Sequence, residues 1–223
     1  MKNILIWIII IFLFARSELF AQSLPNISIF YGPNLTTLKG APFNDRLYTI
    51  SRSLVGVSYQ FQIKNNYSIR TYLAFEKKGV RQTDLILLDT SKTIILDILT
   101  PKSKFNYLSV PIIFNYTVGK KVKYAIGIGG YAAYLINIKD ILEGLNTPKI
   151  TTKRELLVNN RLDLGLSFSS SIAIPISKRL SGHVNLLYNR GIRSFAKTSI
   201  TLENPVYTSS ANLLFGISYS ILH

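Results

Sequence analysis

Few residues of this 223-residue chain have a type and spacing that could support chemistry. The chain has no cysteine, which excludes thiolate chemistry and disulfides, and of its two histidines His223 is the last residue. His183 and Asp163, with a serine, could in principle form a hydrolase site, although no motif marks that serine. Neither metal-ligand spacing nor a phosphate-binding glycine loop is present. We therefore expect no catalytic, cofactor-binding or metal site.

Both residues lie in segments where hydrophobic side chains alternate with small or polar ones. A period of two indicates a β-strand whose faces meet unlike environments. The clearest example is a pair of runs around the basic turn Gly119-Lys120-Lys121, which predicts an antiparallel hairpin. Eight such segments follow Gln22, at residues 26–35, 54–63, 67–76, 105–116, 122–138, 161–176, 182–191 and 211–222.

The connections between these segments alternate in length. They are tight at residues 64–66, 119–121 and 177–181, and long at 36–53, 77–104, 139–160 and 192–210. Short turns at one end and long loops at the other are typical of outer-membrane barrels. The sequence predicts an all-β fold, an eight-stranded antiparallel transmembrane up-and-down barrel of the size of OmpA and OmpX. Within residues 140–153 we expect a short helix.

The composition of the two faces predicts which one meets lipid. The apolar face carries almost no charge, whereas the other is rich in Gly, Ser, Asn and Gln. We expect Ile126 and Ile217 to meet lipid, and Gly127 and Gly216 to face the lumen. Aromatic residues fall at the strand ends on the apolar face, as expected of girdles at both interfaces. They are Phe61, Tyr67, Tyr116, Tyr124 and Tyr219 at one end, and Phe75, Tyr134 and Tyr188 at the other.

The lumen of an eight-stranded barrel is just wide enough for side chains. The alternation places Arg70, Glu76, Asp163 and His183 there, and we predict that they neutralise and hydrogen-bond one another as a structural network. Tyr72, Tyr107 and Tyr131 are expected to help fill the space. Pro111 and Pro175 interrupt strand patterns and lack a donor for the ladder, so a bulge is expected at each.

The N-terminus has the pattern of a secretory signal peptide. Lys2 precedes an apolar run over residues 4–14, and Ala21 offers a small residue at a cleavage point. The predicted division is a signal peptide at 1–21 and a barrel at 22–223, with an uncleaved anchor as the alternative. Loss of residues 1–21 lowers the net charge from +15 to +14. Export argues against a nucleic-acid partner. The basic residues are therefore expected either to face anionic lipid, including lipopolysaccharide, or to form a generally solvated surface.

Several short motifs, in matching order, resemble those of the Bacteroidetes outer-membrane β-barrel proteins, the PorT-like porin family. Residues 107–116, YLSVPIIFNY, resemble its YLxIPLLxKY strand, and residues 128–135 its GxYxxYLL strand. Residues 75–80, 161–166 and 188–192 resemble its YSKKGA, DFGL and YxxGL segments. The C-terminus departs from the family, which usually ends on Phe, because this chain ends Ile221-Leu222-His223. The resemblance implies an outer-membrane barrel; most members have no assigned activity, and a few serve type IX secretion and gliding.

The expected function is therefore non-enzymatic. The barrel would act through its external loops, or as a component or partner of an envelope assembly such as type IX secretion. Two alternatives remain open at this point. One is an outer-membrane lipid hydrolase that uses His183, and the other is a soluble periplasmic barrel that binds an apolar ligand inside.

Overall fold

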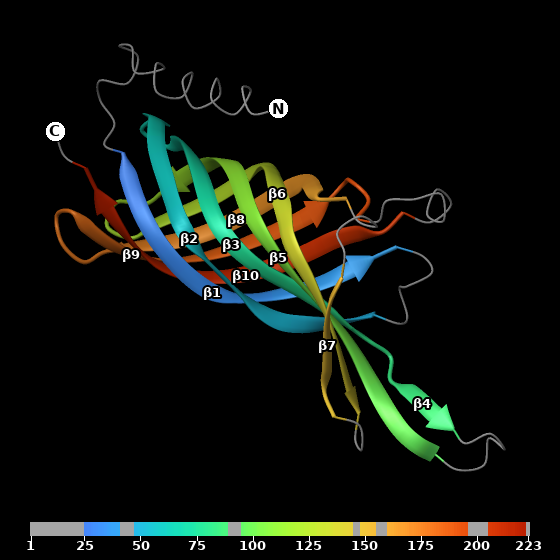
Figure 1. Cartoon of the computed structure of the whole chain (residues 1–223). Coiled ribbons are helices and arrows are strands. Elements are labelled where there is room, and N and C mark those ends of the chain that lie inside the picture. The colour runs from blue at the N-terminus through green and yellow to red at the C-terminus, as the bar shows by residue number, and fades with distance from the viewer. Residues whose placement is uncertain are drawn as a thin grey trace.

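The alternating segments form strands that join edge to edge into a closed ring in the computed structural model (Figure 1). The structure describes residues 25–40, 47–88, 95–144, 148–154, 160–195 and 205–221. Within these ranges the strands are β1 (Asn26–Lys39), β2 (Leu47–Lys64), β3 (Tyr67–Gln82), β4 (Leu85–Leu88), β5 (Ile95–Val118), β6 (Lys123–Gly144), β7 (Ile150–Arg154), β8 (Leu162–Pro175), β9 (Leu180–Gly191) and β10 (Tyr207–Ser220).

Eight of these strands make the ring, in the order β1, β2, β3, β5, β6, β8, β9, β10. Every neighbour is antiparallel, and β1 closes the ring on β10 with Asn26 opposite Ser220 and Lys39 opposite Tyr207. Closure leaves these strands no free edge, so their backbone groups are paired within the wall. The predicted all-β, eight-stranded up-and-down barrel is confirmed.

The wall turns its apolar side chains outward. Ile126 is 65% exposed and Ile217 is 50% exposed, and large apolar residues of every ring strand share their orientation. A Cβ added at Gly127 would meet Asn115 and Ser169, and one at Gly216 would meet His183, so both glycines face the lumen as predicted. A soluble barrel with an apolar cavity needs the opposite arrangement of faces.

Tyrosines lie on the outer face near both ends of the ring. Tyr67, Tyr116, Tyr124 and Tyr219 are exposed at the end that carries the tight turns, and Tyr67 packs against Tyr116 with ring centroids 5.2 Å apart. Tyr134 and Tyr188 are exposed toward the other end, whereas Phe61 and Phe75 are half-buried. Amphipathic rings at these two levels match the interfaces of a bilayer.

The predicted bulges at the two prolines are wrong. Pro111 lies opposite Tyr131 in an unbroken β5–β6 register, and toward β3 the ladder lacks two pairs but keeps its register between Thr71–Ile112 and Ala74–Ser109. A missing N–H therefore interrupts the bonds without adding a residue. Pro175 is the last residue of β8, where a missing donor disturbs no further pair. The β5–β6 irregularity lies instead at Asn106/Tyr107.

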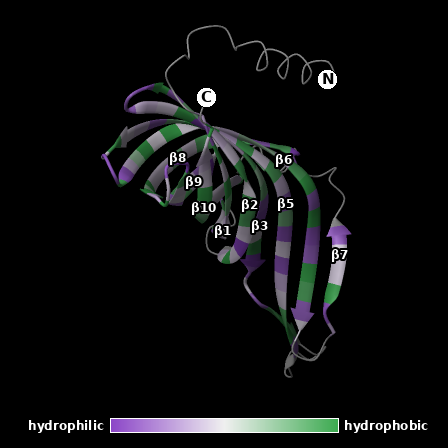
Figure 2. Cartoon of the chain, turned by 90° about the vertical axis from the view of Figure 1, so that its left-hand side faces the viewer, coloured by the Kyte–Doolittle hydropathy of each residue, from purple (hydrophilic) through white to green (hydrophobic). Residues whose placement is uncertain are grey.

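Strands β4, β5, β6 and β7 continue beyond the ring as a projecting sheet (Figures 1 and 2). We call residues 85–88, 95–104, 138–144 and 150–154 the extension. β5 has 24 residues and β6 has 22, about twice the 9–11 that cross a bilayer. Much of the predicted loop 77–104 is therefore strand. The predicted helix at 140–153 is also wrong, because Leu142 pairs with Ile150 in a hairpin.

No helix among the described residues is long and apolar enough to cross a membrane. The predicted signal peptide at residues 1–21, and His223, lie outside the described residues.

Candidate functional site

The lumen is filled in layers, and β3 passes through each of them. Its inward side chains are Ser68 and Arg70, then Tyr72 and Ala74, then Glu76 and Lys78, and finally Val80, all buried. The apolar middle layer is completed by a cluster from five further strands, namely Phe30, Leu54, Ile113, Leu187 and Leu214. The charged side chains of β3 therefore lie in two layers, with Arg70 on one side of this cluster and Glu76 and Lys78 on the other.

Lys78 organises the polar layer nearer the extension. Its Nζ lies 3.2 Å from Asp163 Oδ2 and 3.6 Å from Glu76 Oε2, and all three side chains are at most 5% exposed. The ammonium also sits 4.9 Å from the ring centroid of Tyr107 and 5.2 Å from that of Tyr131. One cation between two carboxylates, flanked by aromatic faces, compensates charges that would otherwise be costly to bury.

Hydroxyl groups complete this layer. Tyr131 donates to Asp163 Oδ1 at 3.1 Å, Thr208 to Asp163 Oδ2 at 2.6 Å, and Ser210 to Glu76 Oε1 at 2.9 Å. These bonds link β3, β6, β8 and β10 across the lumen. The layer therefore ties opposite walls together and has the character of a structural cross-brace.

The second polar layer lies nearer the tight turns. Arg70 donates to Gln60 Oε1 through Nε at 2.8 Å and also through its second nitrogen, Nη2. His183 Nδ1 lies 3.0 Å from Ser218 Oγ, which in turn lies 2.8 Å from Ser28 Oγ. Within the described residues no salt bridge reaches Arg70.

The four predicted lumen residues are all buried, but the structure divides them between these two layers. Glu76 and Asp163 meet at Lys78, whereas Arg70 and His183 bind neutral partners. His183 pairs with Ala173, which is roughly 33 Å along β8 from Asp163 at 3.3 Å per residue. The central cation, Lys78, was missed because residues from 77 onward were assigned to a loop, although the alternation of β3 continues through it.

Within the described residues His183 contacts a serine, Ser218, which was not singled out from the sequence. Both side chains point into the lumen, away from lipid, and the Asp163 carboxylate lies in the other layer. A serine–histidine hydrolase needs a third group to orient the imidazole and a substrate path to the serine. No group of three His, Cys, Asp or Glu side chains that could hold a metal occurs in the described part of the chain.

Apolar side chains close the lumen toward the extension. Phe105 and Phe195 meet edge to face with centroids 5.0 Å apart, within a buried cluster that also holds Val80, Tyr107, Tyr131, Ala133, Leu135 and Ile138. The interior is thus packed over the charged layer. Packing of this kind argues for a rigid scaffold over a wide pore.

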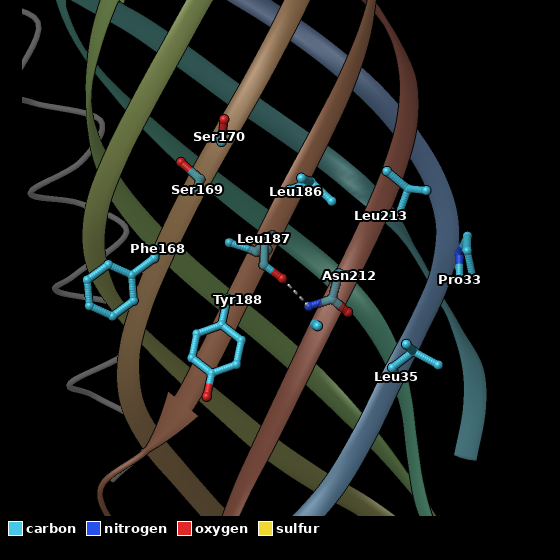
Figure 3. Close-up of a pocket in the computed structure, with 11 residues that line it drawn as sticks. Pro33, Leu35, Phe168, Ser169, Ser170, Leu186, Leu187, Tyr188, Asn212 and Leu213 are labelled. Atoms are coloured by element: carbon cyan, nitrogen blue, oxygen red, sulfur yellow. Dashed lines mark hydrogen bonds between the residues drawn. The ribbon is translucent and has the colours of Figure 1, made fainter. Parts of the chain in front are cut away.

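A hollow of about 550 Å³ lies on the outer face of the wall, across β1, β8, β9 and β10 (Figure 3). It forms where the small residues Ser170 and Ala211 lie among Leu35, Phe168, Leu186, Tyr188 and Leu213. Asn212, behind it, donates to the backbone oxygen of Leu187 at 2.9 Å. The apolar lining faces the lipid side of the barrel and suits an acyl chain.

The extension carries its own ion pairs outside the ring. Lys102 Nζ is 2.5 Å from Glu143 Oε2, and Lys149 Nζ is 2.9 Å from Glu143 Oε1. Hydrogen bonds from these two ammonium groups lower the pKa of Glu143 to about 2. The edge strand β4 exposes three consecutive apolar residues, Leu85, Ile86 and Leu87.

Comparison with known proteins decides the family. Residues 20–197 match the family described as "outer membrane protein beta-barrel domain", which covers more than half of the chain. The chain belongs to this family. Membership of this family places the protein in the outer membrane, which agrees with the apolar outer face of its wall. No curated protein sequence matches it.

OprG from Pseudomonas aeruginosa has the same fold at low identity: it is 9% identical with a TM-score of 0.51, over 92% of this chain and 100% of that chain. Two further solved structures are similar with lower TM-scores. The outer-membrane protease OmpT from Escherichia coli is 9% identical with a TM-score of 0.45, over 92% and 99%. Ail of Yersinia pestis is 12% identical with a TM-score of 0.41, over 87% and 99%.

Proposed function

We propose that this barrel is a non-enzymatic scaffold of a Bacteroidetes-type cell envelope that presents the extension to a protein partner. The partner would belong to an envelope assembly such as type IX secretion, in line with the PorT-like motifs of the sequence. Outer-membrane lipids and lipopolysaccharide surround the wall, and nucleic acid is not a partner. The packed lumen supports this proposal, because it leaves the extension as the most elaborate part of the molecule.

The observation that carries the proposal is the edge of β4. Leu85, Ile86 and Leu87 are each 44–58% exposed on a terminal strand that has no further neighbour among the described strands. An apolar edge strand is an aggregation hazard unless something pairs with it or covers it. Addition of a partner strand supplies main-chain hydrogen bonds and covers these side chains. β7, the other terminal strand, exposes Ile150 among Thr151, Thr152 and Lys153, and is a less apolar edge.

Affinity purification from detergent-solubilised native membranes tests this function. We expect a protein to co-purify with the wild type, and Ile86→Lys to release it because an edge lysine opposes strand addition. Ile150→Lys, the same change on the β7 edge, should retain it. Absence of any enriched protein with the wild type, or equal retention by both variants, would contradict the proposal.

The contact between Ser218 and His183 favours a second candidate, a lipid hydrolase. The assay is acyl release from lipid A by purified protein in detergent micelles, with His183→Ala and Ser218→Ala alongside the wild type. We expect no release from any of the three. Release by the wild type that both substitutions abolish would establish the hydrolase in place of the scaffold.

A further inference from the structure

Three lysines form a continuous row across the extension. Lys104 on β5 lies directly opposite Lys139 on β6, and Lys139 lies directly opposite Lys153 on β7. Residues directly opposite in antiparallel strands have Cβ atoms about 5 Å apart, and like charges at this spacing destabilise the sheet. The row therefore favours an anion that neutralises it.

The acidic residues nearby are engaged elsewhere. In the next row outward, Arg81 forms a salt bridge with Asp84, and Lys102 forms one with Glu143. Glu143 also forms a salt bridge with Lys149. Lys104, Lys139 and Lys153 have no carboxylate within 4.0 Å in the described part of the chain. Burial, together with the charges of Arg52, Lys149 and Lys102, outweighs the attraction of Glu143 and lowers the pKa of Lys104. The protein itself therefore compensates the repulsion on Lys104 only in part.

The row lies on the lipid side of the sheet and just beyond the apolar band. Along β5 the inward residues are Ser103, Phe105 and Tyr107, so Lys104 shares the outer face with Leu108. Leu108 and Tyr134 are exposed opposite each other. Lys104 and Leu108 are four positions apart, about 13 Å along the chain and about 10 Å along the barrel axis at a typical tilt. The head-group region extends about 5–8 Å beyond the hydrocarbon on each side, and lysine side chains reach back toward it.

We infer that Lys104, Lys139 and Lys153 form a binding site for the phosphate groups of an outer-leaflet glycolipid of the lipid A type. The site fixes the height of the extension above the membrane and orients it around the barrel axis. This inference rests on the outer-membrane placement of the barrel and on the extension facing outward, but not on the proposed protein partner. A purified barrel suffices to test it, so its failure is distinguishable from failure of the proposed function.

The test measures binding of bis-phosphorylated lipid A to the full-length barrel in zwitterionic nanodiscs at low ionic strength. A juxtamembrane lysine contributes about fivefold in affinity, so the triple variant Lys104→Gln, Lys139→Gln, Lys153→Gln should bind about 100-fold more weakly. Lys120→Gln, Lys121→Gln, Lys123→Gln, with the same charge change at the opposite end of β5 and β6, should bind as the wild type. Heat-modifiable gel mobility reports folding of both variants, and removal of like charges should not impair it.

Two further arms identify the ligand. Dephosphorylated lipid A should bind wild type and triple variant equally weakly, and inorganic phosphate at the same phosphate concentration should not displace lipid A. Equal losses in the two triple variants would overturn the site, since the effect would then be one of net charge. Undiminished binding of dephosphorylated lipid A, or full displacement by inorganic phosphate, would overturn the glycolipid assignment.

Discussion

The four predicted lumen residues show what the sequence conveys about single side chains. Alternation alone placed Arg70, Glu76, Asp163 and His183 inside, because a strand residue has only two faces to choose from. Alternation does not give height along the barrel, although the strand order does: Asp163 begins one strand of the β8–β9 hairpin and His183 begins the other, so antiparallel pairing separates them. Lys78 could have been found by continuing the β3 pattern by two residues beyond Glu76.

Removal of the Lys78 ammonium should destabilise the barrel strongly. Lys78→Met leaves Glu76 and Asp163 buried without a counter-charge, and breaking a buried ion pair in this way costs about 3–5 kcal/mol. Reversible urea unfolding in liposomes measures the change. Lys77→Met, the neighbouring outward lysine, should alter stability by less than about 1 kcal/mol. A small effect of both substitutions would mean that the charged layer does not brace the walls.

The Glu143 carboxylate should give the extension a dependence on acid pH. Its folded pKa of about 2 lies below the ordinary value of 4.5, so its stabilising effect is present in full above pH 4.5 and is lost as the pH falls through 2. Carbon-13 NMR of labelled glutamate follows this carboxyl directly, with Glu143→Gln to assign the signal. Titration of that signal with a pKa near 4.5 would show that the salt bridges of Glu143 with Lys102 and Lys149 do not form in solution.

At the scale of strands, the apolar pattern marks only those parts that cross the membrane. Residues 95–104 and 138–144 are strand, but the outward face there carries Lys102, Lys104 and Lys139 because it meets water and head groups. The sequence criterion required apolar residues on one face, and so it assigned these stretches to loops. Pro101 lies within this part of β5, opposite Leu142, without a register shift.

The difference between membrane and extension can be measured with one type of substitution. Ile126→Arg and Ile217→Arg place a guanidinium on the lipid face and should each cost about 2–4 kcal/mol, as expected near the bilayer midplane. Ile150→Arg, on an exposed isoleucine of β7, should cost less than about 0.5 kcal/mol because it remains in water. Urea unfolding in liposomes compares the three variants. Similar costs for all three would contradict the assignment of the lipid band.

Ser218→Arg gives the complementary test of the inner face. Ser218 is bonded to His183 and Ser28 in the layer near the tight turns, so an arginine introduced here would have no carboxylate in its own layer. Overpacking in this narrow interior should cost about 1–3 kcal/mol, more than the near-neutral Ser218→Thr. Greater stability of Ser218→Arg than of wild type would contradict this layering.

For the molecule as a whole, the ring and its closure could be predicted from the sequence. Eight alternating segments, with short turns at one end and long connections at the other, are compatible with few folds other than an up-and-down barrel. It could not predict the projecting sheet, which depends on pairing of β4 with β5 and of β7 with β6 outside the ring. The tight turns all lie at one end and the extension lies at the other (Figure 1). A barrel with this asymmetry has two possible orientations in the membrane.

Short periplasmic turns and longer external connections are the rule for such barrels, so we expect the extension on the cell surface. The absence of cysteine from the chain makes single-cysteine variants specific reporters. Thr151→Cys places a thiol on exposed β7, and Lys121→Cys places one in the exposed turn between β5 and β6. A membrane-impermeant maleimide should label Thr151→Cys on intact cells, and Lys121→Cys only after the outer membrane is permeabilised. The reverse pattern would place the extension in the periplasm, where its lysine row would face the inner-leaflet phospholipids and could not reach surface glycolipid.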